Sequence, residues 1–153
     1  MGDSGRKNLL AYLSKTKGEA NTENFSNRIN VQKKIYLLQK LGLDMKYDFG
    51  WYLYGPYSQE LTRDIYNKEA LLGTTNDNPA KTKLPNKDEK ILSQLNEILS
   101  NFKEEELNYW LELLASLQFL ESKSKLKEKK PGKFKDEDIE RCWKILVEYK
   151  LVR

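Results

Sequence analysis

The sequence predicts a mostly α fold with a minor β part: a compact helical domain that contains one short aromatic strand. Over several long stretches apolar residues recur at three- and four-residue steps, which is typical of helices that bury one face. Only the stretch from Met45 to Leu53 alternates with a period of two. The chain has 153 residues, of which 39% are hydrophobic, so it can bury one core, and we expect a single domain over 1–153.

Two helices are predicted before the alternating stretch. Three leucines within residues 6–14 favour a short amphipathic helix. Apolar residues then recur at helical steps and predict a helix over 28–41, which Gly42 should end because glycine accepts the backbone angle of a helix C-terminus. In the stretch that follows, Met45, the other odd positions and Leu53 should face the core.

The motif WYLYGPYSQEL, residues 51–61, indicates a sharp corner in the chain. Gly55 can adopt angles that other residues resist, Pro56 fixes the next angle, and Ser58 can accept a bond from a free helical amide. We therefore expect the strand to pass directly into a helix over 59–72 that Ser58 caps.

The second half of the chain is predicted to be helical. A linker over 73–85 separates two candidate subdomains, 26–72 and 86–151. Asn86 and Asp136 are each placed to cap a helix. The helix predicted over 104–121 is apolar around much of its circumference, so we expect it to lie at the centre of the fold.

The positive charge of the chain is concentrated in one segment, which we call the lysine tract, residues 123–135. Because it holds seven lysines and one glutamate, it carries a net charge of +6, whereas the whole chain carries only +4. The tract fits a surface for nucleic-acid phosphates or an acidic partner. It equally fits a solvated loop or an edge strand protected by lysines. Its lysines are Lys123, Lys125, Lys127, Lys129, Lys130, Lys133 and Lys135.

Composition excludes several kinds of catalysis. The chain has no histidine and one cysteine, Cys142, so it lacks the residues of Ser-His-Asp, Cys-His and zinc-hydrolase sites. Glu60 and Asp64 have a spacing that could share a magnesium ion on one helix face, but a carboxylate in the first turn of a helix is more simply explained by the helix dipole. We expect no catalytic site, no metal and no cofactor.

The chain has no secretory signal and no apolar run of the ~20 residues that span a bilayer. A single cysteine in a helical pattern favours a buried thiol and a reducing compartment. These features predict a soluble, cytoplasmic protein without membrane contact.

Residues 28–38, RINVQKKIYLL, together with residues 52–61, YLYGPYSQEL, resemble the signatures of the YwgA-like family. That family is related in pattern to the Panacea antitoxin-associated domain. Residues 111–117, LELLASL, and 130–134, KPGKF, are similar to archaeal members. The resemblance covers residues 26–151. It implies a mostly helical fold with a winged-helix-like core, no enzymatic activity, and an antitoxin-like role exerted through protein contact.

Two functions follow as hypotheses. The first is a non-enzymatic interaction module, regulatory or antitoxin-like, that binds a protein partner through an aromatic surface made by Tyr52, Tyr54 and Tyr57. The alternative is a nucleic-acid-binding protein that uses the lysine tract, with outward tyrosines stacking on bases. Exposed aromatic residues also fit the contact face of a homodimer.

Overall fold

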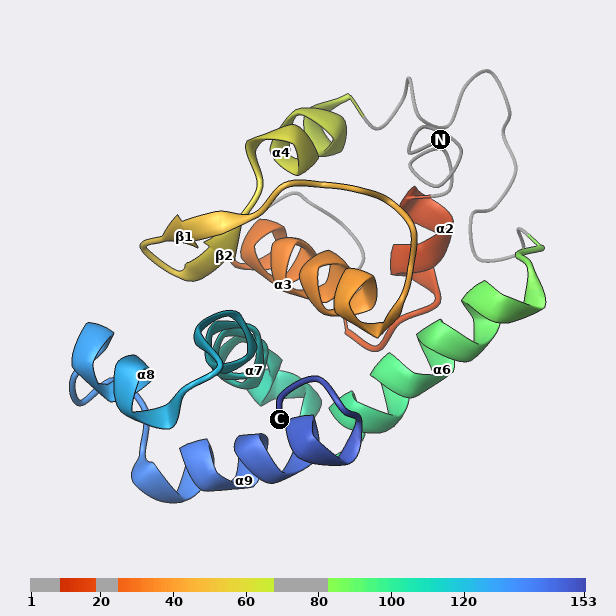
Figure 1. The fold of residues 1–153 in the computed structure, drawn as a ribbon. Helices are drawn as coiled ribbons and strands as arrows, with labels where there is room; N and C mark the ends of the chain where they lie inside the picture. The colour runs from red at the N-terminus through yellow and green to blue at the C-terminus, as the bar shows by residue number, and fades with distance from the viewer. Residues whose placement is uncertain (1–8, 19–24, 68–82) are drawn as a thin grey trace.

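Helices dominate the fold, and two short strands form one hairpin (Figure 1). The structure is a computed structural model that describes residues 9–18, 25–67 and 83–153. The mostly α class with a minor β part is therefore confirmed. The elements in chain order are α2 (Leu9–Ser14), α3 (Phe25–Leu41), β1 (Gly50–Tyr52), β2 (Gly55–Tyr57), α4 (Gln59–Tyr66), α6 (Asn86–Leu99), the 3₁₀ helix η2 (Glu104–Glu106), α7 (Leu107–Leu120), α8 (Lys123–Lys129) and α9 (Asp136–Glu148).

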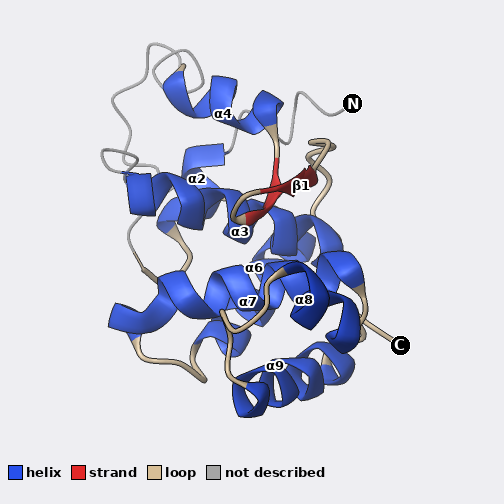
Figure 2. Ribbon diagram, turned by 90° about the vertical axis from the view of Figure 1, so that its left-hand side faces the viewer, coloured by secondary structure: helices blue, strands red, loops and turns tan. Residues whose placement is uncertain are grey.

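Helix α7 is the centre of the packing, as the sequence predicts. Leu111, Leu113, Leu114 and Leu117 are fully buried in it. The helix contacts α3, α8, α9 and β2, and Figures 1 and 2 show it between α3 on one side and α9 on the other. One hydrophobic cluster includes residues from both segments that the sequence suggests as subdomains. Among the described residues no helix has the length and apolar character to cross a membrane.

Helix α3 ends where the sequence predicts. Gly42 has a φ of +123°, and its amide bonds to the carbonyl of Leu38 at 3.1 Å. The amide of Leu43 bonds to the same carbonyl at 2.9 Å, so the last turn of the helix is closed. Helix α2 covers residues 9–14 of the predicted range 6–14, and residues 6–8 lie outside the described residues.

Ser58 caps α4 as predicted, because its side chain accepts from the amide of Leu61 at 3.1 Å. The predicted continuation of that helix over 68–72 lies outside the described residues, as does most of the linker. The caps predicted for the later helices are wrong. Asn86 and Asp136 are already the first helical residues, and backbone carbonyls of Pro85 and Lys135 accept the opening bonds at 3.0 Å.

The alternating stretch is confirmed at its start and wrong at its end. Met45 and Tyr47 are buried, and the intervening side chains are exposed. Leu53, however, is 76% exposed, because the chain reverses at residues 53 and 54 and returns as β2. The strand therefore does not pass directly into a helix: an antiparallel hairpin stands between, with Trp51 opposite Pro56 and Tyr52 opposite Gly55.

The first part of the lysine tract is a helix, α8, and the alternatives of a loop or an edge strand are wrong for residues 123–129. The alternation of lysines suggests a strand face, but Leu126 is fully buried and anchors a helix against α7. Ser122 caps this helix by accepting from the amide of Lys125 at 3.2 Å. Lysine also has a high helix propensity, so its spacing is compatible with either structure.

Replacing Gly55 should destabilise the fold more than replacing Gly132. Gly55 has a φ of +95°, and an added Cβ would lie 2.4 Å from the Ser116 hydroxyl. Gly132 has a φ of +73° and nothing within 4 Å of an added Cβ. We expect Gly55→Ala to lower the free energy of unfolding by about 2 kcal/mol or more, and Gly132→Ala by about 1 kcal/mol, in chemical denaturation. Equal losses would show that contact with Ser116 contributes nothing.

Candidate interaction site

The tip of the hairpin presents apolar side chains to solvent. Tyr52 is 47% exposed and Leu53 is 76% exposed, and they are neighbours in the chain. The other large hydrophobic side chains that are exposed among the described residues, Tyr66 and Val147, lie on α4 and α9. Figure 1 shows the tip projecting from the molecule on the side where α8 lies. The tip is therefore a small apolar surface at the end of a regular element.

The hairpin carries all three tyrosines of the predicted surface, but they differ in role. The rings of Tyr52 and Tyr57 pack edge to face, with centroids 5.2 Å apart. The hydroxyl of Tyr57 accepts from Thr62 Oγ1 at 2.7 Å, so this tyrosine also joins the hairpin to α4. Tyr54 is half-buried and its ring lies 5.2 Å from the Nζ of Lys133. Tyr52 is the most exposed of the three.

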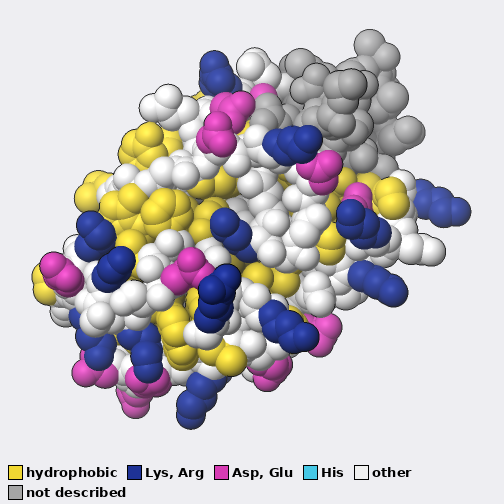
Figure 3. Space-filling model, in the orientation of Figure 1, with side chains coloured by type: hydrophobic (Ala, Val, Ile, Leu, Met, Phe, Trp, Pro, Cys, Tyr) yellow, Lys and Arg dark blue, Asp and Glu magenta, His cyan; other side chains and the backbone are white. Residues whose placement is uncertain are grey.

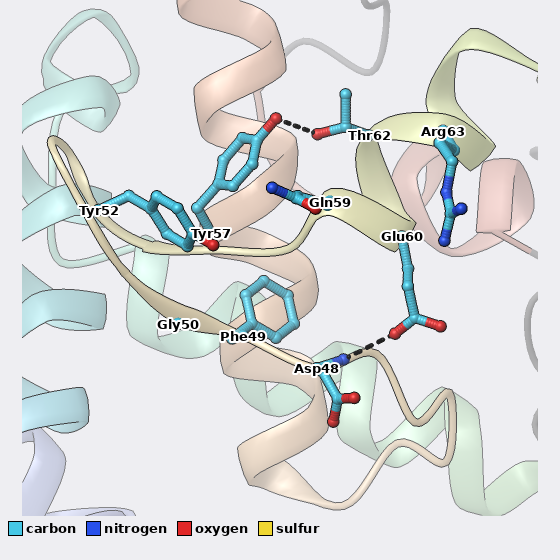
Figure 4. A pocket seen from close by; sticks show the side chains of 9 residues that line it. All are labelled: Asp48, Phe49, Gly50, Tyr52, Tyr57, Gln59, Glu60, Thr62 and Arg63. Carbon is cyan, nitrogen blue, oxygen red and sulfur yellow. Dashed lines mark hydrogen bonds between the residues drawn. The ribbon is translucent and has the colours of Figure 1, made fainter.

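A shallow hollow of about 650 Å³ lies between the hairpin and α4 (Figure 4). Tyr52 and Tyr57 stand at the end near the tip, whereas Asp48, Glu60 and Arg63 stand at the other end. Gly50 lies between them, and the Tyr52 ring lies close enough that an added Cβ there would be 3.1 Å from it. One end of the hollow is thus aromatic and the other is charged.

The carboxylates considered as a metal pair instead join parts of the chain. Glu60 Oε1 accepts from the backbone amide of Asp48 at 3.1 Å. The carboxylate of Asp64 accepts from the hydroxyl of Tyr47 at 2.6 Å. Both carboxylates therefore fix the segment before β1 against α4, which explains their four-residue spacing without an ion.

Two side chains of α3 hold the base of the hairpin. Gln32 is buried, its Oε1 accepts from the amide of Ser58 at 2.9 Å, and its Nε2 donates to the carbonyl of Ser58 at 3.1 Å. The Nζ of Lys33, which is also fully buried, donates to the carbonyl of Pro56 at 2.6 Å. The Gln-Lys pair and the Gly-Pro-Tyr-Ser motif, which are separate in sequence, therefore meet in space.

Sequence reasoning missed this role of Gln32 and Lys33. The signal in the sequence is only that Gln32, Lys33 and Lys34 are three consecutive polar residues within an otherwise apolar helix, and the structure shows all three buried. Buried polar groups need partners, and the carbonyl of Pro56, which points away from β1, accepts from Lys33.

Burial lowers the pKa of Lys33 to about 8. The carboxylate of Glu112 acts in the opposite direction, and the ammonium groups of Lys130 and Lys133 add to the lowering. Glu112 itself is buried and contacts the Nζ of Lys133 at 2.6 Å and the Nζ of Lys130 at 3.4 Å. One carboxylate thus lies among three lysines beneath the hairpin.

The lysine tract lies beside the hairpin, so the two surfaces predicted from the sequence adjoin. Lys130 donates to the carbonyl of Leu53 at 2.5 Å, and its Nζ lies 5.5 Å from the centre of the Trp51 ring. Burial also lowers the pKa of Lys130. Together with Lys133 over Tyr54, these contacts place the end of the tract against the hairpin tip.

Three carboxylates contact four of the seven lysines in the tract. Lys123 pairs with Glu140 at 2.8 Å, and Lys127 pairs with Asp136 at 3.4 Å. Lys130 and Lys133 share Glu112. In the described part of the chain no ion pair is found for the remaining lysines, which are Lys125, Lys129 and Lys135.

The thiol of Cys142 is buried, and burial raises its pKa to about 12. A thiol with this pKa is protonated at neutral pH, and the thiolate is the reactive form. Cys142 therefore serves as a core residue of α9.

Comparison with protein-family models, with curated proteins and with solved structures finds no match for this chain. The resemblance to the YwgA-like family stays a prediction from the sequence, together with the winged-helix-like core that it implies.

The stability of the fold should depend on the protonation of Lys33. Below pH ~8 the amine is protonated in both the folded and the unfolded state. The whole cost of burying its charge then lowers the free energy of unfolding. Between pH ~8 and 10.5 the folded state loses the proton first, so the unfolded chain binds more protons and the free energy of unfolding rises with pH. Lys33→Met lacks this rise.

Denaturation of both proteins from pH 7.5 to 10.5 measures the effect, because the two proteins differ at residue 33 alone. We expect the difference in stability to move in favour of the native chain by at most about 3 kcal/mol over this range. A difference that is constant with pH would mean that Lys33 is not desolvated in the folded protein.

Proposed function

We propose that this protein is a non-enzymatic interaction module that binds a protein partner through the hairpin. Its contact region, the hairpin surface, consists of Tyr52, Leu53, Tyr54 and Tyr57. The observation that carries the proposal is the exposure of Leu53 and Tyr52 at the tip of a hairpin whose base is fixed by buried polar bonds.

A fixed base favours binding because it lowers the cost of ordering the surface. The backbone of Ser58 and the carbonyl of Pro56 are bound to α3, and the carbonyl of Leu53 is bound to Lys130. The hairpin is thus held at its base and at its tip. Preorganised surfaces lose less conformational entropy when a partner docks.

The chemistry of the tip fits a protein contact. Aromatic residues are enriched among the side chains that dominate binding energies at protein interfaces. Burying an exposed leucine contributes about 1.5–3 kcal/mol, and Tyr52 adds apolar area next to it. In Figure 3 hydrophobic side chains gather over the hairpin, with lysine or arginine side chains at their border.

The polar groups near the hairpin support binding rather than catalysis. Lys33 is engaged by Pro56, and Glu112 is engaged by two lysines. A regulatory, antitoxin-like role is the form of this function that the YwgA-like resemblance implies. The proposal places the protein in the cytoplasm, where a buried, unpaired cysteine is common.

The charges favour a protein over a nucleic acid as the partner. Four lysines of the tract are in ion pairs, so part of the charge that phosphates would need is already offset. Contact between the exposed side chain of Leu53 and a phosphate backbone would add little binding free energy. Nucleic-acid binding through the tract is the alternative, and it predicts affinity for random DNA or RNA that falls steeply as salt rises.

A double variant at the tip tests the proposal. Tyr52→Ser with Leu53→Ser should leave the fold intact, because both side chains are exposed, and should weaken partner binding by about ten- to a hundredfold. The matched control is Tyr66→Ser with Val147→Ser, which removes similar exposed apolar area elsewhere.

The measurement is a pull-down from extracts of the source cells, followed by titration of the recovered partner. The control variant should retain the partner. Retention of every partner by the tip variant would overturn the proposal. Tight salt-dependent binding of random RNA or DNA, lost on Lys125→Glu with Lys129→Glu, would establish the alternative.

A further inference from the structure

The two outer edges of the hairpin differ in how their backbone groups are satisfied. The outer edge of β2 is closed by α3: Gln32 binds both backbone groups of Ser58, and Lys33 binds the carbonyl of Pro56. Pro56 has no amide hydrogen to leave free. These side chains occupy the positions that a neighbouring strand would take, so nothing can be added on this side.

The outer edge of β1 is open. Trp51 lies opposite Pro56, whose carbonyl points away from β1 to Lys33, so this pair is not hydrogen-bonded across the ladder. The amide and carbonyl of Trp51 therefore point away from β2. The amide and carbonyl of Phe49, two residues earlier and just before the strand, point to the same side as those of Trp51. In the parts of the chain that the structure describes, neither residue has a backbone partner on that edge, and the sheet has two strands only.

Two hollows adjoin the residues at the start of β1. The hollow of about 650 Å³ includes Asp48, Phe49 and Gly50 in its lining (Figure 4). A second hollow of about 310 Å³ is lined by Asp48 and Phe49 on one side and by Phe119 and Glu121 on the other. The start of β1 therefore borders unfilled space towards α4 and towards α7.

Charge distinguishes the two ends of the open edge. Lys123 and Lys127 pair with carboxylates of α9, so Lys125 and Lys129, on the opposite flank of the buried Leu126, lie on the side of α8 away from α9. Figure 1 shows the hairpin on that side of α8. The tip end of the edge is therefore positive.

Two further observations sharpen this polarity. Lys130 and Lys133 share the single carboxylate of Glu112, which leaves a net positive charge against the tip. At the other end of the edge the exposed Asp48 provides a negative charge.

We propose that the open edge of β1 binds an extended segment of the partner protein as a third strand, with acidic side chains at the end that meets the hairpin tip. This inference rests on the proposed function and specifies how the partner is recognised. The amide and carbonyl of Trp51 and Phe49 pair with the backbone of the segment, and Lys125 and Lys129 attract its acidic end.

A library of random twelve-residue peptides displayed on phage, selected on the full chain, supplies the probe. We expect selected peptides to lack proline, to be rich in β-branched residues and to carry acidic residues clustered at one end. Amide hydrogen exchange then maps the bound peptide, and the amides of Phe49 and Trp51 should become protected. Selection of no peptide, or of peptides without an acidic end, would overturn the inference.

Charge variants form the second arm. Lys125→Glu with Lys129→Glu should lower the affinity for the selected peptides by about tenfold, since two attractive charges become repulsive. The control, Lys87→Glu with Lys90→Glu, makes the same change of net charge on exposed positions of α6, which lies on the other side of the molecule (Figure 1). The control should change the affinity by less than about twofold. Equal weakening by both variants would contradict recognition of the acidic end at the tip.

The outcomes separate the inference from the proposed function. If the tip variant loses the natural partner but no ligand protects Phe49 and Trp51, strand addition is wrong and the proposed function stands. If the chain alone forms a dimer in which these two amides are protected, the edge of β1 binds a second copy of this chain, and the inference is overturned.

Discussion

The contact of Gln32 and Lys33 with the backbone at Ser58 and Pro56 is the interaction on which the rest of the site depends. These side chains lie on a helix whose neighbours are buried, so their polar ends have no access to water and must find partners within the fold. The hairpin provides those partners. Leaving them unmade would cost about 1–3 kcal/mol for each polar group, and more for a charged one.

This attachment has consequences in both directions from α3. Towards the core, Lys33 lies in a group with Glu112 on α7 and two lysines that follow α8, so three separate segments meet beneath the hairpin. Gly55 permits this close approach, because any side chain there would meet Ser116. Towards solvent, the same attachment fixes the direction of the tip, and among the described residues the outer edge of β1 has no neighbouring strand. A buried polar network therefore determines which part of the hairpin is presented.

Much of this fold could be predicted from the sequence, since apolar periodicity and backbone constraints are local. The periodicity predicts α3 and α7, Gly42 and Ser58 predict the end of one helix and the start of another, and the two-residue alternation predicts which side of residues 45–49 is buried.

The hairpin was missed because β2 is only three residues long and two of them, Gly55 and Pro56, are more typical of a turn. The helix α8 was missed because one buried leucine decides between two structures that the lysine spacing allows. The three tyrosines of the candidate site lie on one hairpin, and their role as a contact surface stays a prediction. The role of Gln32 depends on a contact between residues 26 positions apart, which no local pattern contains.

The exchange rate of the Ser58 amide in the native chain tests the central claim most directly, because in the described part of the chain this amide donates to the side chain of Gln32 alone. If the contact fixes the hairpin to the core, the amide should exchange as slowly as the slowest amides of α7, which open only with global unfolding. Exchange of the Ser58 amide while α7 remains protected would show that the hairpin detaches from α3 in the folded state, and it would contradict the account.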